Sequence, residues 1–294
     1  MSFVLGPNRY GKAENRVVRI YRDTARHEIR DLNVTTTLRG DFTAAHVEGD
    51  QSNVLTTDTQ KNTAFAYAKQ VGVSSPEEYA VALGARLLVA APAATASRVQ
   101  VEEFPWDRVE VAGAGHDHTF VRRGTEVRTA VVVHERGAAP LVVSGFRDLV
   151  VLKSTGSEFK GFLREEYTTL RDADDRILAT SLTARWRHED DGGSDWDAGW
   201  AAVRRTCLEA FAGTYSRALQ QTLYAMGAAV LEAHPQVAEI DFVAPNKHHF
   251  LVDLSSFGVD NDGEVFIAAD RPYGLIEARV QREAHDCREH FGEF

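Results

Sequence analysis

The first candidate for chemistry is Lys12, one of only six lysines among 294 residues. It follows Tyr10 and Gly11, and we expect the glycine to let the backbone turn so that the amine approaches whatever lies beyond the first strand. A lysine that burial makes less basic can accept and return a proton. The ordinary interpretation is an exposed surface amine, so the spacing leaves both open.

A second polar group, Thr56–Thr59, holds three threonines and an aspartate ahead of a helix that we expect to open at Lys61 and Asn62. An N-cap explains one of these side chains, because threonine and aspartate oxygens accept hydrogen bonds from the first helical N–H groups. The helix N-terminus together with a hydroxyl would also form a polar pocket for an anionic or oxygen-rich ligand. The sequence by itself favours the cap.

Histidines provide the only other pattern typical of a reactive or metal site. His116 and His118 are two residues apart, and His248 and His249 are adjacent. Three or four ligands must converge on a metal ion, yet neighbouring residues of a strand point to opposite faces, so this spacing argues against a metal site. The sequence contains no G-x-G-x-x-G after a strand, no P-loop and no G-x-S-x-G elbow. Nucleotide, phosphoryl-transfer and serine-hydrolase chemistry therefore have no motif behind them.

The elements that must position these residues follow one pattern, which begins with strands at residues 15–22 and 29–38. Leu32, Val34, Thr36 and Leu38 alternate on one face of the second strand. A helix with a stripe of Phe65, Ala68 and Val71 follows, and then a second helix that opens with the capping box Ser75-Pro76-Glu77-Glu78 and runs to about Ala91. Strands at residues 99–111 and 120–135, the latter bent at Gly124, complete the unit.

The same order of elements recurs in the second half. Strands are expected at residues 141–153 and 177–188, and again at 238–254 and 265–280. Between them lie two helices with apolar stripes, Trp200/Val203/Cys207/Phe211 and Leu219/Leu223/Met226/Val230. The offset of roughly 130–135 residues indicates a duplicated domain rather than a solenoid. We therefore predict an α+β protein with units at residues 1–138 and 139–294, each an antiparallel four-stranded sheet with two helices.

Such sheets have unpaired edges, and pairing with another copy into a barrel is one way to close them, so we expect an oligomer. The formal net charge of −10 argues against nucleic acid or an anionic membrane as a partner. Cys207 and Cys287 are too few for a disulfide framework or a zinc site, and Cys207 fits a core position. No apolar run suggests a signal peptide or a membrane span, and Gly292–Phe294 is not a peroxisomal signal, so we expect a cytoplasmic protein.

Six groups of residues occur in order through both halves: Tyr10–Lys12; Thr57–Asp58 with Lys61–Asn62; His116–Phe120; Leu152–Thr155 running into Phe159–Phe162; Tyr167–Leu170 with Asp175–Arg176; and Pro245–His248. Together they resemble the urate oxidase (uricase) family, over about residues 9–280. The resemblance implies two tunnelling-fold units per chain and a homotetrameric barrel. It also implies oxidation of urate by O₂ and water to 5-hydroxyisourate and hydrogen peroxide, without cofactor or metal.

The resemblance also implies how urate is held. Phe159 corresponds to the aromatic residue that stacks on the purine, while Arg176 and Gln220 correspond to the groups that bind its two edges. An arginine fork and an amide suit a planar anion with a carbonyl and an N–H on each edge. Leu219 and the Thr57-Asp58 helix start would add backbone contacts. Gln221 follows directly, so the assignment of Gln220 rests on the motif context and on the Leu219/Leu223 stripe.

Lys12, Thr57 and His248 correspond to the proton relay of the family, with His248 tuning the lysine. Asn246, together with Thr57, would hold O₂ or the attacking water above the purine. The resemblance further implies that each site is shared between subunits, with Lys12 and Thr57 from one chain and the purine-binding residues from its neighbour.

Two alternatives on the same fold stay open. One is a zinc-dependent pterin-type lyase or cyclohydrolase that uses His116, His118 and a further ligand, and the other is a non-catalytic purine-binding barrel. The stretch from Glu283 to the C-terminus matches nothing in the family that we can place.

Overall fold

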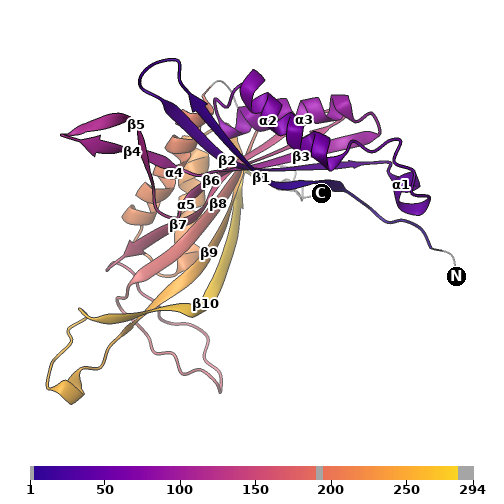
Figure 1. The fold of residues 1–294 in the computed structure, drawn as a ribbon. Coiled ribbons are helices and arrows are strands. Elements are labelled where there is room, and N and C mark those ends of the chain that lie inside the picture. The colour runs from indigo at the N-terminus through magenta and orange to yellow at the C-terminus, as the bar shows by residue number, and fades with distance from the viewer. Residues whose placement is uncertain (1–2, 190–194, 284–294) are drawn as a thin grey trace. The chain divides into compact units, whose positions relative to one another are not determined.

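The computed structural model describes residues 3–189 and 195–283 (Figure 1). Its strands are β1 (Tyr10–Tyr21), β2 (Glu28–Gly40), β3 (Ala94–Glu103), β4 (Trp106–Val111), β5 (Ala114–Arg122), β6 (Val127–Glu135), β7 (Leu141–Lys153), β8 (Leu178–His188), β9 (Val237–Leu251) and β10 (Phe266–Gln281). Its helices are α1 (Thr43–Val47), α2 (Thr57–Gln70), α3 (Pro76–Ala90), α4 (Trp196–Gly213) and α5 (Leu219–Ala233), with a short 3₁₀ turn at Ser255–Phe257. The predicted α+β class is confirmed. The segment 190–194 and the residues from 284 onward, including Cys287, lie outside the described residues.

The chain forms two compact units. Unit 1 contains residues 3–146 with Arg185–Trp200, and unit 2 contains Arg147–Ala184 with residues 201–283. Strands β7 and β8 and helix α4 therefore contribute to both. The boundary that we expect between residues 138 and 139 concerns a sequence repeat, which a division by spatial contacts does not test, and it stays a prediction.

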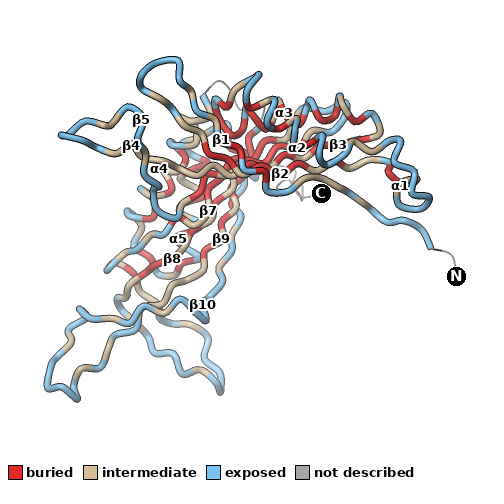
Figure 2. The backbone as a smooth tube through the Cα atoms, viewed as in Figure 1, coloured by how far each residue is buried: buried red, intermediate tan, exposed pale blue. Residues whose placement is uncertain are grey.

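Unit 1 is built on an antiparallel sheet in the order β1-β2-β3-β6. Helix α2 packs against β1, and α3 packs against β3 and β6. Figure 2 shows the buried residues in red where these helices meet the sheet. The alternation predicted for β2 is confirmed, because Leu32, Val34, Thr36 and Leu38 are all fully buried. The N-cap half of the predicted capping box of α3 is confirmed, because the Ser75 hydroxyl accepts a hydrogen bond from the Glu78 N–H at 3.1 Å. The Glu78 carboxylate accepts from the Ser74 hydroxyl rather than from the Ser75 N–H.

The predicted apolar stripe of α2 is wrong. Phe65 and Val71 are exposed, and the residues that α2 buries are Gln60, Ala64 and Ala68. Gln60 can be buried because its amide makes two hydrogen bonds inside the unit, accepting from the Thr36 hydroxyl at 2.9 Å and donating to the Leu55 carbonyl at 3.3 Å. A stripe of large apolar residues at helical spacing could not indicate this buried face, because the face consists of a polar residue and two alanines.

The region between β3 and β6 also differs from the prediction. The two long strands expected at residues 99–111 and 120–135 are each interrupted, and their inner halves pair as a separate hairpin of β4 and β5. The bend expected at Gly124 is a break between strands, with the glycine at φ +37. Unit 1 thus has a hairpin that the repeat pattern does not include.

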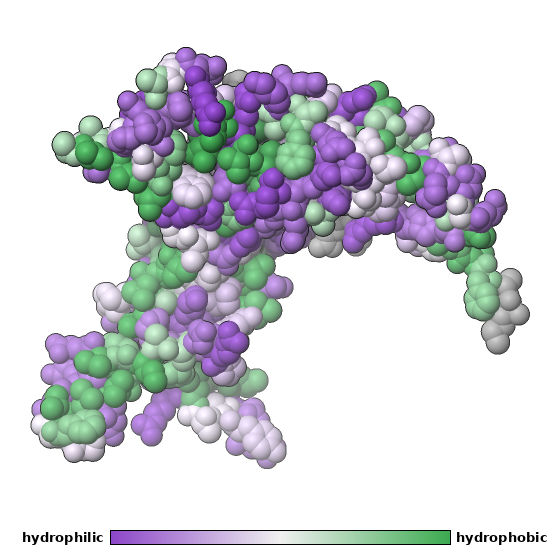
Figure 3. Space-filling model, in the orientation of Figure 1, coloured by the Kyte–Doolittle hydropathy of each residue, from purple (hydrophilic) through white to green (hydrophobic). Residues whose placement is uncertain are grey.

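Unit 2 has strands in the order β7-β8-β9-β10, with α5 against β9 and β10. The predicted stripe of α5 is confirmed, since Leu219, Leu223, Met226 and Val230 are buried. In α4 Val203, Cys207 and Phe211 are buried, whereas Trp200 of the predicted stripe is only partly buried. Burial raises the pKa of the Cys207 thiol to about 12, so this cysteine is an inert core residue at neutral pH. Figure 3 shows apolar side chains at the surface of the part of the molecule that holds β9 and β10. Four large apolar residues of these strands are exposed: Phe250, Leu251, Ile267 and Leu275.

The two units repeat a packing arrangement that the sequence reasoning did not find. A Cβ on Gly84 of α3 would lie 2.7 Å from a ring carbon of His134, and a Cβ on Gly227 of α5 would lie 2.4 Å from Val280. Each glycine lets the second helix of its unit approach the last strand closely. Arg136 and Arg282, which follow those strands, donate to the last carbonyls of α3 and α5 respectively. Both units therefore contain a helix glycine that contacts a strand side chain and an arginine that binds the carbonyls at the end of that helix.

Candidate functional site

A pocket of about 510 Å³ in unit 2 gathers most of the residues predicted to bind a ligand. It is lined by residues from the 156–177 loop, the start of α5 and the facing part of β9 and β10: Phe159, Leu170, Arg171, Ala173, Arg176, Ile177, Leu219, Gln220, Asn246, His248, His249, Phe250 and Ile276. Phe159, Arg176, Leu219, Gln220, Asn246 and His248 were predicted from the sequence, and the structure places all six together.

The loop is built so that Phe159 has little freedom. Its backbone N–H donates to the Ala173 carbonyl at 2.8 Å, and the Ala173 N–H donates back to the Phe159 carbonyl at 2.9 Å. The Phe162 ring stacks on the Phe159 ring, with 5.1 Å between the centroids and 13° between the planes. Such offset stacking fixes the plane of the ring. An aromatic face is therefore held ready in the pocket.

Arg176 lies beside this ring with its hydrogen-bonding capacity unused. Its guanidinium carbon is 4.8 Å from the centroid of Phe159, and its backbone N–H is anchored to the Ser157 carbonyl at 2.7 Å. The Nε–H is buried and has no hydrogen-bond partner in the described part of the chain. Burial lowers the pKa of Arg176, although its charge persists at neutral pH. A buried cation without an acceptor is costly, which points to an acceptor that arrives with a ligand.

Asp175 supports Arg176 from the neighbouring position. Its carboxylate accepts from the Thr155 hydroxyl at 2.5 Å and from the Ser157 N–H at 3.2 Å. The hydrogen bond from Thr155, followed by those from backbone amides, holds the pKa of Asp175 below its usual value. Because Ser157 also binds the Arg176 backbone, the aspartate fixes the turn from which the guanidinium projects.

The start of α5 resolves the ambiguity between two adjacent glutamines. Gln220 lines the pocket, whereas the Gln221 side-chain oxygen accepts the Arg217 backbone N–H at 2.8 Å. Gln221 is thus occupied in closing the first turn of the helix. Leu219, which is buried, forms the adjoining wall.

The strand β9 contributes Asn246 and His248 at an irregular point of the sheet. The pairing of β10 with β9 shifts register between Ala269 and Gly274, opposite these two residues. His249 also lines the pocket, and both histidines pair in regular register with Ala269 and Ala268 of β10. The His248 ring stacks on Phe250 with 5.8 Å between centroids.

The sequence reasoning missed several lining residues: Leu170, Arg171, Ala173, Ile177, His249, Phe250 and Ile276. Leu170 belongs to a motif that carries the family resemblance and could have been found from it. His249 belongs to the histidine pattern, which we considered only as a metal site. The others have no signal of residue type or spacing that separates them from ordinary loop and strand residues.

The remaining predicted residues, Lys12, Thr57 and Asp58, lie in unit 1. Lys12 is within β1 and pairs with Thr36 of β2. We expected Gly11 to provide a turn, and this expectation is wrong. A Cβ at this position would lie 1.8 Å from the Thr36 carbonyl oxygen, so the glycine is required because β1 and β2 approach each other closely here. Gln60 ties the same Thr36 to the start of α2, which places Lys12 near the helix N-terminus.

At that N-terminus the cap is Thr56, whose hydroxyl accepts the Thr59 N–H at 3.1 Å. The neighbouring Thr57 hydroxyl and the Lys12 ammonium make no hydrogen bond or ion pair within residues 3–189 and 195–283. Lys61 holds the pKa of Asp58 below its usual value through a hydrogen bond and its charge, and the charge of Lys12 adds to this. The cap therefore accounts for Thr56 alone among the four polar residues. The Thr57 hydroxyl and the Lys12 ammonium stay available to bind a ligand.

The histidine pattern of unit 1 gives no metal site. The rings of His116 and His118 lie 4.5 Å apart edge to face, and His27 is 6.0 Å from His118. No group of side chains suited to hold a metal ion occurs among the residues that the structure describes. The zinc-dependent alternative thus gains no support from geometry.

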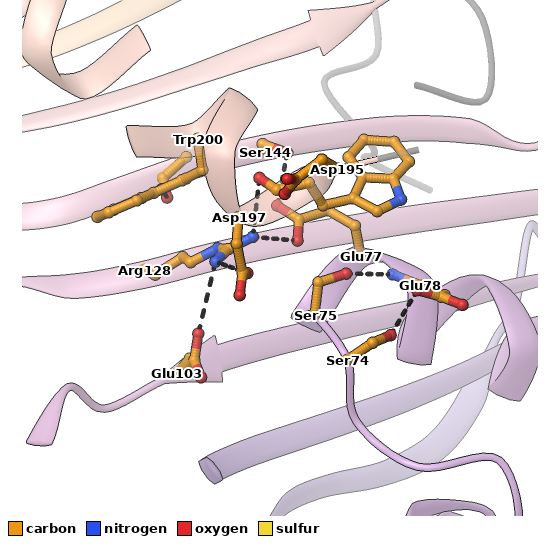
Figure 4. A network of polar contacts seen from close by, with 12 residues as sticks. Ser74, Ser75, Glu77, Glu78, Glu103, Arg128, Ser144, Asp195, Asp197 and Trp200 are labelled. Atoms are coloured by element: carbon orange, nitrogen blue, oxygen red, sulfur yellow. Dashed lines mark hydrogen bonds and ion pairs between the residues drawn. The ribbon is translucent and has the colours of Figure 1, made fainter. Parts of the chain in front are cut away.

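A buried polar network in unit 1 is the other prominent cluster of charged groups (Figure 4). Arg128 bridges Glu77 of α3, at 2.7 Å, to Asp197 at the start of α4, at 2.6 Å. Ser144 of β7 donates to Glu77 at 2.7 Å. Burial raises the pKa of Glu77, and the charge of Arg128 opposes that rise. Arg128 is thus joined to carboxylates of α3 and α4, and Glu77 also to β7, which is typical of a structural tie between helix and sheet.

Comparison with known proteins gives one consistent result. A model of the uricase family matches residues 8–133 and 142–277. A uricase from Arthrobacter globiformis is 55% identical over 280 residues, covering 95% of this chain and 90% of the relative, and a uricase from Danio rerio is 38% identical over 93% of each. A crystal structure of uricase from Arthrobacter globiformis superposes with a TM-score of 0.92 at 53% identity, covering 97% of both chains.

Proposed function

The chain belongs to the uricase family, and from that premise we propose that it oxidises urate with O₂ and that the pocket of unit 2 holds the purine. In the proposed reaction urate and water give 5-hydroxyisourate, while O₂ takes up two electrons and two protons to become hydrogen peroxide. No cofactor enters this balance, because urate supplies both electrons.

One observation carries the assignment of the pocket: Arg176 has a buried Nε–H without an acceptor, next to an aromatic face, in a pocket that Gln220 also lines. The guanidinium offers a planar set of donors to the carbonyl and deprotonated nitrogen on one edge of urate. The Gln220 amide can donate and accept at another edge. Phe159 would stack on the ring, and Leu219 would add contacts at the α5 start.

Proton transfer is assigned to the residues of unit 1 and β9. Lys12 and Thr57 have polar groups without partners in the described residues, which suits a lysine and hydroxyl that pass protons between urate, water and peroxide. Asp58 at the same helix start would contribute backbone contacts. We assign His248 to tuning the lysine, and Asn246 to holding O₂ or the attacking water, in the latter role together with Thr57.

We further propose the family assembly: two tunnelling-fold units per chain, residues 1–138 and 139–294, and a homotetrameric barrel in which each site takes Lys12 and Thr57 from one subunit and the Arg176 pocket from its neighbour. The edge strands β1 and β10 leave hydrogen-bonding groups that a second copy would pair. A cytoplasmic location is part of the same proposal. No helix in the described part of the chain is long and apolar enough to cross a membrane.

The proposed activity is tested by mixing the purified oligomer with urate in air and following the near-ultraviolet absorbance of urate. The expected result is loss of urate in the native protein and little loss in Arg176→Ala. A folded native oligomer that leaves urate unchanged would rule the proposal out.

Sharing of the site is tested by complementation. Lys12→Met and Arg176→Ala are each expected to be nearly inactive, but a hybrid oligomer of the two contains some sites with both native residues if those residues come from different chains. Recovery of activity on unfolding and refolding the mixture is expected, with each variant refolded alone as the control. A mixture no more active than its components would contradict shared sites.

A further inference from the structure

Arg171 lines the same pocket as Arg176, yet the family resemblance assigns it no role. The residue is exposed, so its guanidinium lies at the part of the pocket that faces solvent. No hydrogen bond or ion pair involves it within the residues that the structure describes. Arg171 therefore presents a full positive charge at the entrance of a pocket that already holds a buried one.

The acids that follow Arg171 in the loop have other partners, while Glu166 of the same loop, like Arg171, makes no hydrogen bond or ion pair in the described residues. Arg164 donates to Asp172 at 3.0 Å, and Lys160 donates to Asp174 at 2.7 Å. Asp175 is occupied by a hydroxyl and a backbone amide. The acids adjacent to Arg171 in the sequence are thus taken up by other partners, and none of them neutralises it. The charge of Arg171 therefore has no ion-pair partner among the described residues, in a chain whose formal net charge is −10.

The negative net charge of the protein repels a negatively charged substrate as it approaches. We propose that Arg171 is the capture residue of the pocket: its charge concentrates the urate anion at the entrance, from which Arg176 takes it. This inference rests on the proposed function, and it adds a role in recruitment that the stacking ring, the arginine fork and the proton relay do not supply. The chemistry recognised is that of a small planar monoanion.

The mechanism has a definite dependence on salt. A single charge several ångströms from an anion in a hydrated pocket changes the local anion concentration by roughly 2- to 6-fold at low ionic strength. The Debye length falls from about 30 Å at 0.01 M salt to about 3 Å at 1 M, so the effect disappears in concentrated salt. A direct hydrogen bond from Arg171 to bound urate would instead persist.

The test compares Arg171→Gln with Arg171→Lys, which keeps the charge, and with Arg86→Gln. Arg86 is an exposed arginine of α3 outside the pocket lining, and it too has no hydrogen bond or ion pair in the described residues, so its variant matches the change in net charge. Steady-state rates are measured from about 0.01 M to about 1 M salt. Urate binding is measured separately by equilibrium dialysis without oxygen, when no turnover occurs.

We expect Arg171→Gln to lower kcat/KM and anaerobic affinity by roughly 2- to 6-fold at low salt, with kcat unchanged and the difference gone at high salt. Arg171→Lys and Arg86→Gln should behave like the native protein. Equal kcat/KM and equal urate affinity of Arg171→Gln and native protein at low salt would overturn the proposal. A loss of kcat/KM that persists at high salt and that Arg171→Lys does not rescue would also overturn it. If the proposed function itself is wrong, native protein will bind no urate at any salt concentration. That result differs from every outcome in which only the role of Arg171 is wrong.

Discussion

Replacement of Arg176 by alanine should weaken urate binding without lowering the stability of the protein. In the free protein the guanidinium is half-buried beside Phe159, and its Nε–H has no acceptor in the described residues, so the desolvation of this group is already in place before urate arrives. A hydrogen bond to a charged group contributes about 1.5–3 kcal/mol. Two such bonds from the guanidinium fork to urate correspond to about 3–6 kcal/mol, or on the order of 10²- to 10⁴-fold in affinity.

The same observation predicts that Arg176→Ala leaves the protein as stable as before or slightly more stable. The change removes a half-buried cation that has no ion pair in the described residues, and it deletes no side-chain hydrogen bond made by them. Asp175→Ala is the matched control from the adjacent position. It removes the bonds to Thr155 and Ser157 and should lower the melting temperature.

The assay is equilibrium dialysis of urate without oxygen, paired with thermal unfolding of each variant. Arg176→Lys keeps the charge but loses the fork, so it should fall between native protein and alanine, at about 1.5–2 kcal/mol or roughly 10- to 30-fold. Unchanged urate affinity in Arg176→Ala would refute the clamp. A clear loss of stability in that variant would refute the argument that the guanidinium is held for a ligand.

Three further outcomes follow from the geometry. Lys12→Met should lower kcat far more than urate affinity, because a proton relay acts in the chemical steps; unchanged turnover would remove Lys12 from the relay. Gln220→Ala should weaken anaerobic urate binding, whereas Gln221→Ala should mainly lower the melting temperature, and the reverse pattern would mean that the assignment has slipped by one residue. Gly227→Ala should destabilise the protein by about 1–3 kcal/mol in denaturant unfolding. Adding Val280→Ala should recover part of that loss, since Val280 is the side chain that the new Cβ would meet, and no recovery would contradict the close helix-to-strand contact.

Much of the fold was readable from local patterns. The α5 stripe and the N-cap at Ser75 follow from helical spacing and end chemistry, and both are present. The stripe on α2 was wrong because its packing depends on Gln60, a polar residue that becomes acceptable only after Thr36 and Leu55 provide partners. Tertiary hydrogen bonding of this kind leaves no trace in hydrophobic periodicity.

The site also contains residues that the sequence predicted and residues that only the structure showed. The motifs around Phe159 and Arg176 identified residues that the structure brings into one pocket. Arg171 carried no such signal, since an arginine in a polar loop is ordinary in sequence and becomes distinctive only when its neighbours are seen to be paired. Gln220 and Gln221 were separable only by the hydrogen bond that occupies the second of them.

The central claim is that the protein oxidises urate with O₂ as the only oxidant. The most direct measurement is the ratio of urate consumed, O₂ consumed and peroxide formed by chelator-treated native oligomer in metal-free buffer. The account predicts about one of each per turnover, with the rate unaffected by the chelator. Absence of urate consumption, or activity that disappears with chelator and returns with added metal, would contradict it.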